Sequence, residues 1–178
     1  MIGMVIVPTE RRSLTEMRQL VRRKIEDAFP TDPVPAAVDA IEPTHCVEHL
    51  HEILGGRAWN DLTPLNYRHC SDGFSLLTVT GLHYYLPGYM IAELTDPDEA
   101  DVVAKYWTDT LGGYSEFDRE RMAALGKLVS IDQVDAIALW IGYYANSNGF
   151  DKYVRQSYAT LENWANQAVT RSIRRDEI

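Results

Sequence analysis

Apolar residues recur at three- and four-residue spacing along most of the chain, the pattern of helices that bury one face. The first such stripe follows a capping-box sequence at Ser13–Glu16 and stops at Phe29, because the residue before a proline disfavours the helical conformation. Similar stripes and start signals predict about seven helices in all, near residues 14–28, 44–54, 78–94, 97–111, 118–128, 131–145 and 150–168. A further short helix is predicted after Thr63-Pro64.

Prolines interrupt this pattern at two places. Pro87 lies inside the stretch 78–94 and is predicted to kink the helix or split it in two, since proline lacks a backbone donor. Residues 30–43 contain four prolines and are predicted to form a loop.

Alternating, strand-like patterns are scarce. They occur at Met4–Val7 and Phe74–Leu77, and two pieces of four residues allow at most a minor short β ribbon. The predicted fold class is therefore all-α, a single compact multi-helix domain over residues 1–178, with residues 1–12 extended or poorly ordered.

Composition agrees with one globular domain. A chain of 178 residues with 46% hydrophobic and 24% charged residues can bury a hydrophobic core large enough to be stable without disulfide bonds or a bound metal. Two cysteines do not suggest a disulfide framework, so reduced thiols and a cytoplasmic location are expected. No apolar run approaches the ~20 residues of a membrane span, and we expect no membrane association.

Charge is the first feature that bears on function. A net charge of −9 argues against nucleic-acid binding, which needs a basic surface. Seven carboxylates fall between Glu26 and Arg57 with no Lys or Arg among them, and nine fall between Glu93 and Glu120. This pattern indicates either a solvated surface or a site for a basic partner. The candidate partner-binding residues are Asp32, Asp39, Glu42, Glu48, Glu52, Asp98, Glu99 and Asp101.

Four of the five histidines and both cysteines fall between residues 45 and 70. Zinc is held by four such ligands, with pairs often two to four residues apart. Cys46 and His49 would lie one helical turn apart, and His69-Cys70 could complete the set; His45 with His49 is an alternative pair. Neighbouring side chains on a helix point about 100° apart, so an adjacent His-Cys pair is an awkward chelate. The alternative is buried cysteines and partly exposed histidines, with no metal.

Signatures of common enzyme classes are absent from the sequence, including G-x-S-x-G, a phosphate-binding glycine loop and H-E-x-x-H. A nucleophile formed by Cys46 or Cys70 with His83 stays open. The aromatic segment His83–Met90 and the pair Tyr143-Tyr144 are expected to be core, with an interface role as the alternative.

Three short blocks carry a family resemblance: Trp59–Leu62, Phe74–Thr78 and Tyr84–Tyr89. They resemble an uncharacterised bacterial family of small helical proteins that read W-x-D-L, L-[ST] and [YF]-[YF]-L-P-A-[YF]. The resemblance covers about residues 14–128. It implies an all-helical domain and brings no activity, and typical members have cysteine where this chain has His49.

Two functions follow as expectations. The first is a non-enzymatic, acidic protein-binding protein of the immunity or antitoxin type, which neutralises a basic toxin by direct contact. The second is a zinc protein with a site at Cys46, His49, His69 and Cys70, structural more than catalytic.

Overall fold

The computed structural model describes residues 13–44 and 48–176, and this part of the chain is all-α, as predicted. Two 3₁₀ helices cover Trp59–Asp61 and Asp72–Leu76. The α-helices are α1 (Leu14–Ala28), α2 (Ala37–Ala40), α3 (Glu48–Leu54), α4 (Pro64–His69), α5 (Val79–Thr95), α6 (Pro97–Ala100), α7 (Val103–Leu111), α8 (Glu116–Leu125), α9 (Ile131–Asn148) and α10 (Lys152–Asp176).

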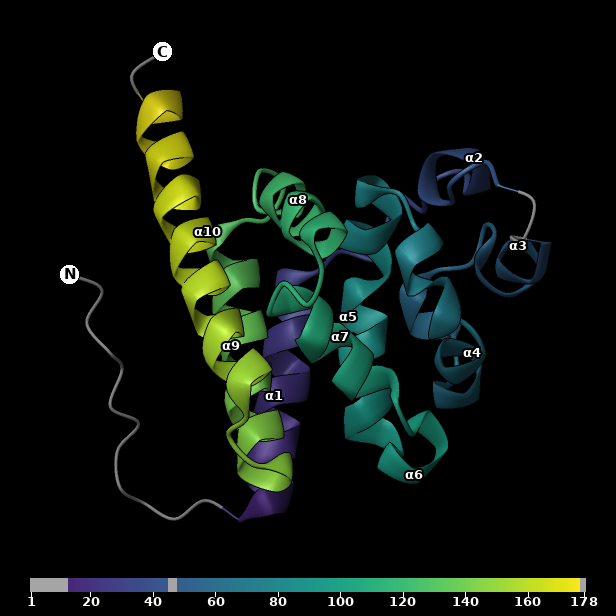
Figure 1. Cartoon of the computed structure of the whole chain (residues 1–178), viewed down its shortest axis with the longest axis horizontal. Helices are drawn as coiled ribbons and strands as arrows, with labels where there is room; N and C mark the ends of the chain where they lie inside the picture. Colours follow the sequence, from purple (N-terminus) through teal and green to yellow (C-terminus); the bar gives the residue numbers. More distant parts are fainter. Residues whose placement is uncertain (1–12, 45–47, 177–178) are drawn as a thin grey trace.

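The helix α5 is the centre of the domain. It packs against α1, α2, α4, α6, α7 and α8, and is therefore apolar on nearly every side. On one side of it, α9 lies between α1 and α10, and on the other α2, α3 and α4 form the opposite end of the molecule (Figure 1). No helix in the described part is long and apolar enough to cross a membrane.

Large aromatic side chains fill the core, as expected for the segment 83–90. Tyr85 and Tyr89 are buried, and each hydroxyl donates to a backbone carbonyl at the edge of the core, Tyr85 to Leu54 at 2.7 Å. Trp140 is also fully buried, and its indole N–H donates to the carbonyl of Met90 at 3.1 Å. These bonds satisfy the polar ends of rings that otherwise contribute apolar area.

Most of the helix starts predicted from capping residues are confirmed. Capping boxes are present at Ser13, Thr63 and Ser130, and the side chains of Thr78 and Asp96 also cap their helices. The predicted start at Asp118 was wrong. Ser115 is the N-cap of α8, and Asp118 is its reciprocal partner, accepting a hydrogen bond from the Ser115 backbone N–H at 3.0 Å.

The structure tests the predicted continuity of two helices. Of the two alternatives at Pro87, the split was wrong, because α5 runs through Pro87 as one helix. The prediction of one helix over 97–111 was also wrong, because Asp101, with a φ of 52°, separates α6 from α7. Val102 and Tyr106 of this stretch are 39% and 45% exposed.

The candidate strand at Phe74–Leu77 does not form, which agrees with the expectation of at most a minor β ribbon. Most of this segment belongs to the 3₁₀ helix Asp72–Leu76, and only Leu77 forms an isolated antiparallel bridge, with Ile41. That bridge ties the predicted loop 30–43, which contains the short helix α2, to the start of α5. The other candidate strand, Met4–Val7, lies outside the described residues, as does the start of the predicted helix 44–54.

Candidate functional site

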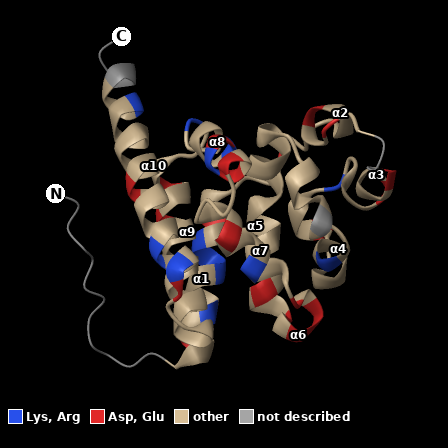
Figure 2. Ribbon diagram, in the orientation of Figure 1, with Lys and Arg blue, Asp and Glu red and all other residues tan. Residues whose placement is uncertain are grey.

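Five of the predicted partner-binding carboxylates belong to α2, α3 and the chain segments next to these helices. We call them the α2–α3 acidic surface: all five side chains are exposed, and they are Asp32, Asp39, Glu42, Glu48 and Glu52. Figure 2 shows acidic residues on α2 and α3 at one corner of the view. Glu48 opens α3, where the helix dipole favours a negative charge. Asp39 likewise lies in the first turn of the short helix α2.

None of these five carboxylates belongs to the three ion pairs of the described residues. The nearest cation along the chain, Arg57, is directed to backbone groups. Its guanidinium donates to the carbonyl of Ile53 at 3.3 Å and to that of Asp61 at 2.9 Å. The charge of this surface is therefore not cancelled by direct contacts.

The three acids of the α6 region do not join this surface. In Figure 2 α6 lies at the far end of the same side, with α4 between it and α2–α3. Asp98 and Glu99 are in the first turn of α6, where the dipole stabilises them. Asp101 lies past the end of α6 and forms an ion pair with Arg68 of α4 at 2.9 Å. The structure thus divides the eight predicted residues into two groups.

The candidate zinc ligands differ in their surroundings. His49 and His69 are exposed, whereas Cys70 is completely buried, and burial raises the pKa of its thiol to about 12. A thiol held in this way is protonated and is a poor ligand, because zinc binds the thiolate. Cys46 and His45 lie outside the described residues, and within these residues no group of three or more His, Cys, Asp or Glu could hold a metal ion. Zinc binding stays a prediction.

The possible Cys–His nucleophile can be followed only through Cys70 and His83. The His83 imidazole contacts the Gln133 side chain of α9 at 3.0 Å and packs at 6.4 Å from the Phe29 ring. Among the described residues, no hydrogen bond joins His83 to Cys70. The structure therefore gives His83 a position between α1, α5 and α9 as part of the packing.

A cavity that sequence reasoning missed lies between the 3₁₀ helix Asp72–Leu76, α7 and α8. Its volume is about 690 Å³, within the range of roughly 300–1,000 Å³ typical of small-molecule sites. We call it the α7–α8 pocket. Its apolar walls are Phe74, Val102, Tyr106 and Tyr114, and its polar walls include Lys105, Asp109, Asp118 and Arg121.

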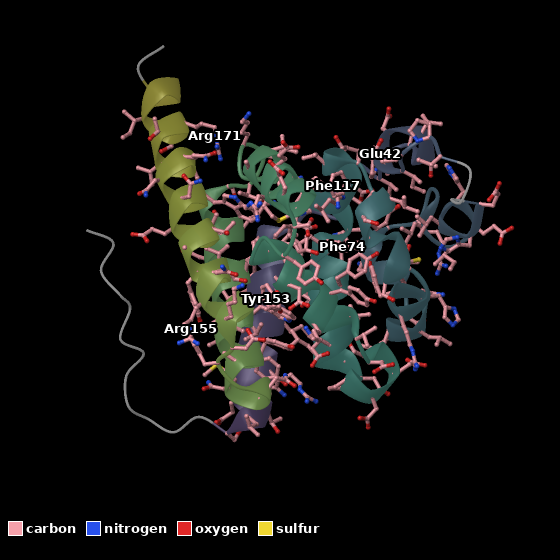
Figure 3. All side chains as sticks on the ribbon, in the orientation of Figure 1. Glu42, Phe74, Phe117, Tyr153, Arg155 and Arg171 are labelled. Atoms are coloured by element: carbon pink, nitrogen blue, oxygen red, sulfur yellow. The ribbon has the colours of Figure 1, made fainter. Side chains whose placement is uncertain are left out.

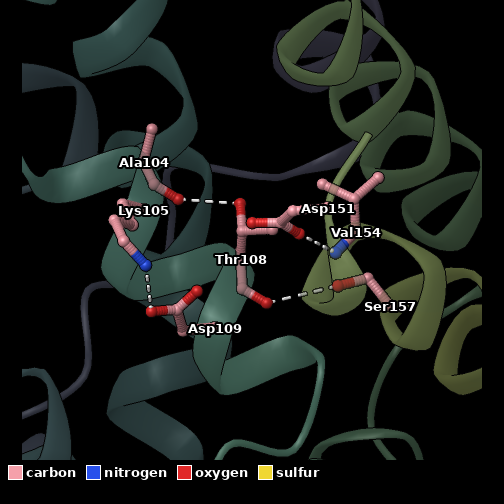
Figure 4. A network of polar contacts seen from close by, with 7 residues as sticks. All are labelled: Ala104, Lys105, Thr108, Asp109, Asp151, Val154 and Ser157. Atoms are coloured by element: carbon pink, nitrogen blue, oxygen red, sulfur yellow. Dashed lines mark hydrogen bonds and ion pairs between the residues drawn. The ribbon is translucent and has the colours of Figure 1, made fainter. Parts of the chain in front are cut away.

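One polar pair of this pocket, on α7, is shown in Figure 4. The Lys105 ammonium donates to Asp109 Oδ2 at 2.6 Å, and this hydrogen bond raises the pKa of Lys105. Asp109 Oδ1 is buried and accepts no hydrogen bond. The next turn of α7 is held against α10, where Ser157 donates to the carbonyl of Thr108 at 3.2 Å.

The other notable polar group is Arg121 of α8, which is buried with 7% of its surface exposed. Its Nη2 donates to the carbonyls of Phe74 at 3.1 Å and Leu77 at 2.6 Å, and its guanidinium lies 5.2 Å from the Phe117 ring. Figure 3 labels Phe74 and Phe117, which lie one above the other in that view. Arg121 Nη1 is buried without any hydrogen-bond partner, and burial lowers the pKa of the guanidinium.

A buried carboxyl group lies elsewhere, on α5. Glu93 is 8% exposed, and burial raises its pKa to about 7, an effect that the charge of Arg18 on α1 partly opposes. The same carboxyl contributes to raising the pKa of Tyr144 on α9. Glu93 therefore changes its charge near neutral pH, inside the contact between α1, α5 and α9.

Comparison with known proteins places the chain in a family. Residues 17–168 match a family of unknown function, DUF6714, and the chain belongs to this family. The match extends beyond the region of the sequence resemblance and includes most of α9 and α10. No curated protein and no solved structure matches the chain.

Proposed function

We propose that this member of the DUF6714 family is a protein-binding protein that recognises a basic partner through its α2–α3 acidic surface. Within that class, we propose an immunity- or antitoxin-type protein that neutralises a toxin by direct contact in the cytoplasm. The observation that carries the proposal is the set of five exposed carboxylates, none of which has an ion-pair partner among the described residues.

A carboxylate without an ion-pair partner presents its full negative charge, and so its electrostatic field, to an approaching protein. A carboxylate bonded to Lys or Arg, such as Asp101 with Arg68, presents little net charge to an approaching partner. Complementary fields raise association rates by about 10–10³-fold, and the effect falls as salt screens it. An immunity protein must capture its toxin faster than the toxin reaches its target, so such a surface suits the proposed role.

The test is co-expression with the product of the neighbouring gene, followed by stopped-flow association kinetics. Wild-type protein should suppress that product's toxicity and bind it at a rate that falls with ionic strength. The double variant Asp39→Lys/Glu52→Lys should slow association at least 10-fold. Both side chains are exposed, so the variant should fold normally.

The matched control is Asp135→Lys/Glu162→Lys, which makes the same change in net charge at exposed positions of α9 and α10. It should leave the rate nearly unchanged. Equal slowing by both variants would mean that net charge acts without a defined surface. A neighbouring product that is harmless, or stays toxic beside wild-type protein, would contradict the immunity role.

A further inference from the structure

The α7–α8 pocket shares no lining residue with the α2–α3 acidic surface, although the charge of Glu42 acts on Arg121. Two of its lining residues carry a buried polar atom without a partner: Arg121 Nη1 has no acceptor and Asp109 Oδ1 has no donor. An unpaired buried polar atom is unfavourable, most of all in a charged group, so native proteins seldom leave one without a reason. Two of them in the walls of one cavity indicate a ligand that supplies both partners.

The state of Arg121 is best seen beside another arginine of the same chain. Arg171 of α10 also holds two backbone carbonyls, those of Gly126 at 3.1 Å and Val129 at 2.5 Å. Arg171 uses both terminal nitrogens for this purpose. Arg121 holds its two carbonyls with Nη2 alone and keeps Nη1 without a partner. Binding to backbone carbonyls therefore explains the position of Arg121 Nη2 but not that of Nη1.

Charge limits what the ligand can be. Lys105 and Arg121 contribute two positive charges to the pocket, and Asp109 and Asp118 contribute two negative charges. The Lys105 charge is matched by Asp109 at 2.6 Å, while Asp118 Oδ2 accepts from the Ser115 hydroxyl at 2.6 Å in the capping box. Arg121 donates hydrogen bonds only to neutral carbonyls, while the charges of Asp118 and Glu42 act on it without a direct bond. A single carboxylate can therefore bond directly to Nη1, whereas a multiply charged phosphate would be repelled by these acidic side chains.

The aromatic side chains of the pocket indicate what the apolar part of the ligand is. Phe74 forms one wall, and Tyr106 and Tyr114, which are 45% and 66% exposed, stand at the rim. Aromatic rings in such positions pack against flat apolar groups, and ring–ring contacts add to the stabilisation that burial of their area gives.

We propose that the α7–α8 pocket binds a small aromatic carboxylate that also carries a hydroxyl group. The carboxylate accepts from Arg121 Nη1, and the hydroxyl donates to Asp109 Oδ1. The aromatic ring lies against Phe74, Tyr106 and Tyr114. Side-chain adjustment at the pocket wall, which is common on binding, brings the ligand's polar groups onto the two buried atoms.

The test uses three probes of one shape, measured by calorimetry and by amide chemical-shift mapping on the full chain. We expect 4-hydroxyphenylacetate to bind saturably and to shift resonances of α7 and α8. Its primary amide, 4-hydroxyphenylacetamide, should bind at least 10-fold more weakly because it brings no charge to Arg121. Phenylacetate, which lacks the donor for Asp109, should bind several-fold more weakly.

Variants locate the site. Tyr106→Ala/Tyr114→Ala should weaken binding of 4-hydroxyphenylacetate at least 5-fold without unfolding the chain, since both rings are largely exposed. Arg121→Gln should abolish the preference for the acid over the amide, and Arg171→Gln, the matched control, should preserve it. If Arg121→Gln does not fold, the acid–amide comparison on wild-type protein and the tyrosine variant decide the question.

Several results would overturn the proposal. They are equal binding of acid and amide, no saturation below about 10 mM, chemical shifts that map away from α7 and α8, and unchanged binding by the tyrosine variant. Equal binding of 4-hydroxyphenylacetate and phenylacetate would overturn the role of Asp109. None of these outcomes depends on the neighbouring gene's product, so the pocket and the acidic surface can fail independently.

Discussion

Replacing Gly88 by alanine gives the sharpest test of the packing around α5. Gly88 lies in the interior of this helix, where sequence rules predict that alanine stabilises a protein by up to about 1 kcal/mol. The structure predicts the opposite sign. A Cβ at this position would overlap the hydroxyl and ring of Tyr67, which is 1% exposed and cannot move into solvent without leaving the core.

The magnitude follows from what Tyr67 would lose. Its hydroxyl donates to the carbonyl of Trp59 at 2.6 Å, and an unpaired buried carbonyl costs about 1–3 kcal/mol. Crowding a well-packed core costs a further ~1–3 kcal/mol. The Tyr67 ring also lies 4.7 Å from that of Tyr89, a contact that a shift would weaken. After subtracting the helical gain, Gly88→Ala should reduce the free energy of unfolding by about 2–4 kcal/mol.

Urea unfolding followed by circular dichroism measures this change, with Gly142→Ala as the control. Gly142 lies inside α9, and its Cβ would meet only the Tyr158 hydroxyl at 3.5 Å, an ordinary contact. That variant should be as stable as wild type or up to about 1 kcal/mol more stable. In a Tyr67→Ala background, Gly88→Ala should lose its penalty, because the overlapping ring is gone. Stabilisation by Gly88→Ala, or an unchanged penalty in that background, would refute the reasoning.

Three further predictions concern pH and local contacts. Because the pKa of Glu93 is raised from its ordinary value of 4.5 to about 7, its contribution to stability is full below about pH 4.5 and is lost as the pH rises from there through about 7. Glu93→Gln should therefore exceed wild type by about 1–2 kcal/mol at pH 8.5 and by little at about pH 4. The full shift would correspond to about 3 kcal/mol, which remaining water contact reduces; equal differences at both pH values in urea titrations would contradict this. Ser130→Ala removes the cap of α9 and should cost about 1 kcal/mol, read from the urea midpoint, whereas Ser172→Ala, at an exposed site within α10, should cost less. Trp140→Phe removes the indole donor to the Met90 carbonyl and puts a smaller ring in a fully buried site, so it should lower the free energy of unfolding by about 2 kcal/mol; a loss below about 0.5 kcal/mol would contradict this.

Local chemistry was readable in the sequence. Helix starts such as those at Ser13 and Ser130 depend on a side chain and a backbone group three residues apart, so the pattern alone identified them. The all-α class followed from periodicity in the same way, and so did the core position of Tyr85 and Tyr89 within a continuous apolar segment. The charge of the α2–α3 acidic surface was also evident, because its five members are close in sequence.

Contacts between distant segments decided the rest. The alternation of Phe74–Leu77 made this segment a candidate strand. In the structure, Arg121, more than forty positions away, donates to the carbonyls of Phe74 and Leu77 around the 3₁₀ helix that forms instead. The α7–α8 pocket combines residues of a 3₁₀ helix and two α-helices, and no spacing in the sequence relates Arg121 to Asp109. Gly88 reads as a weak helix residue until Tyr67 is seen against it. Sequence patterns report interactions within a few turns, whereas burial and the pairing of polar atoms are properties of the packed molecule.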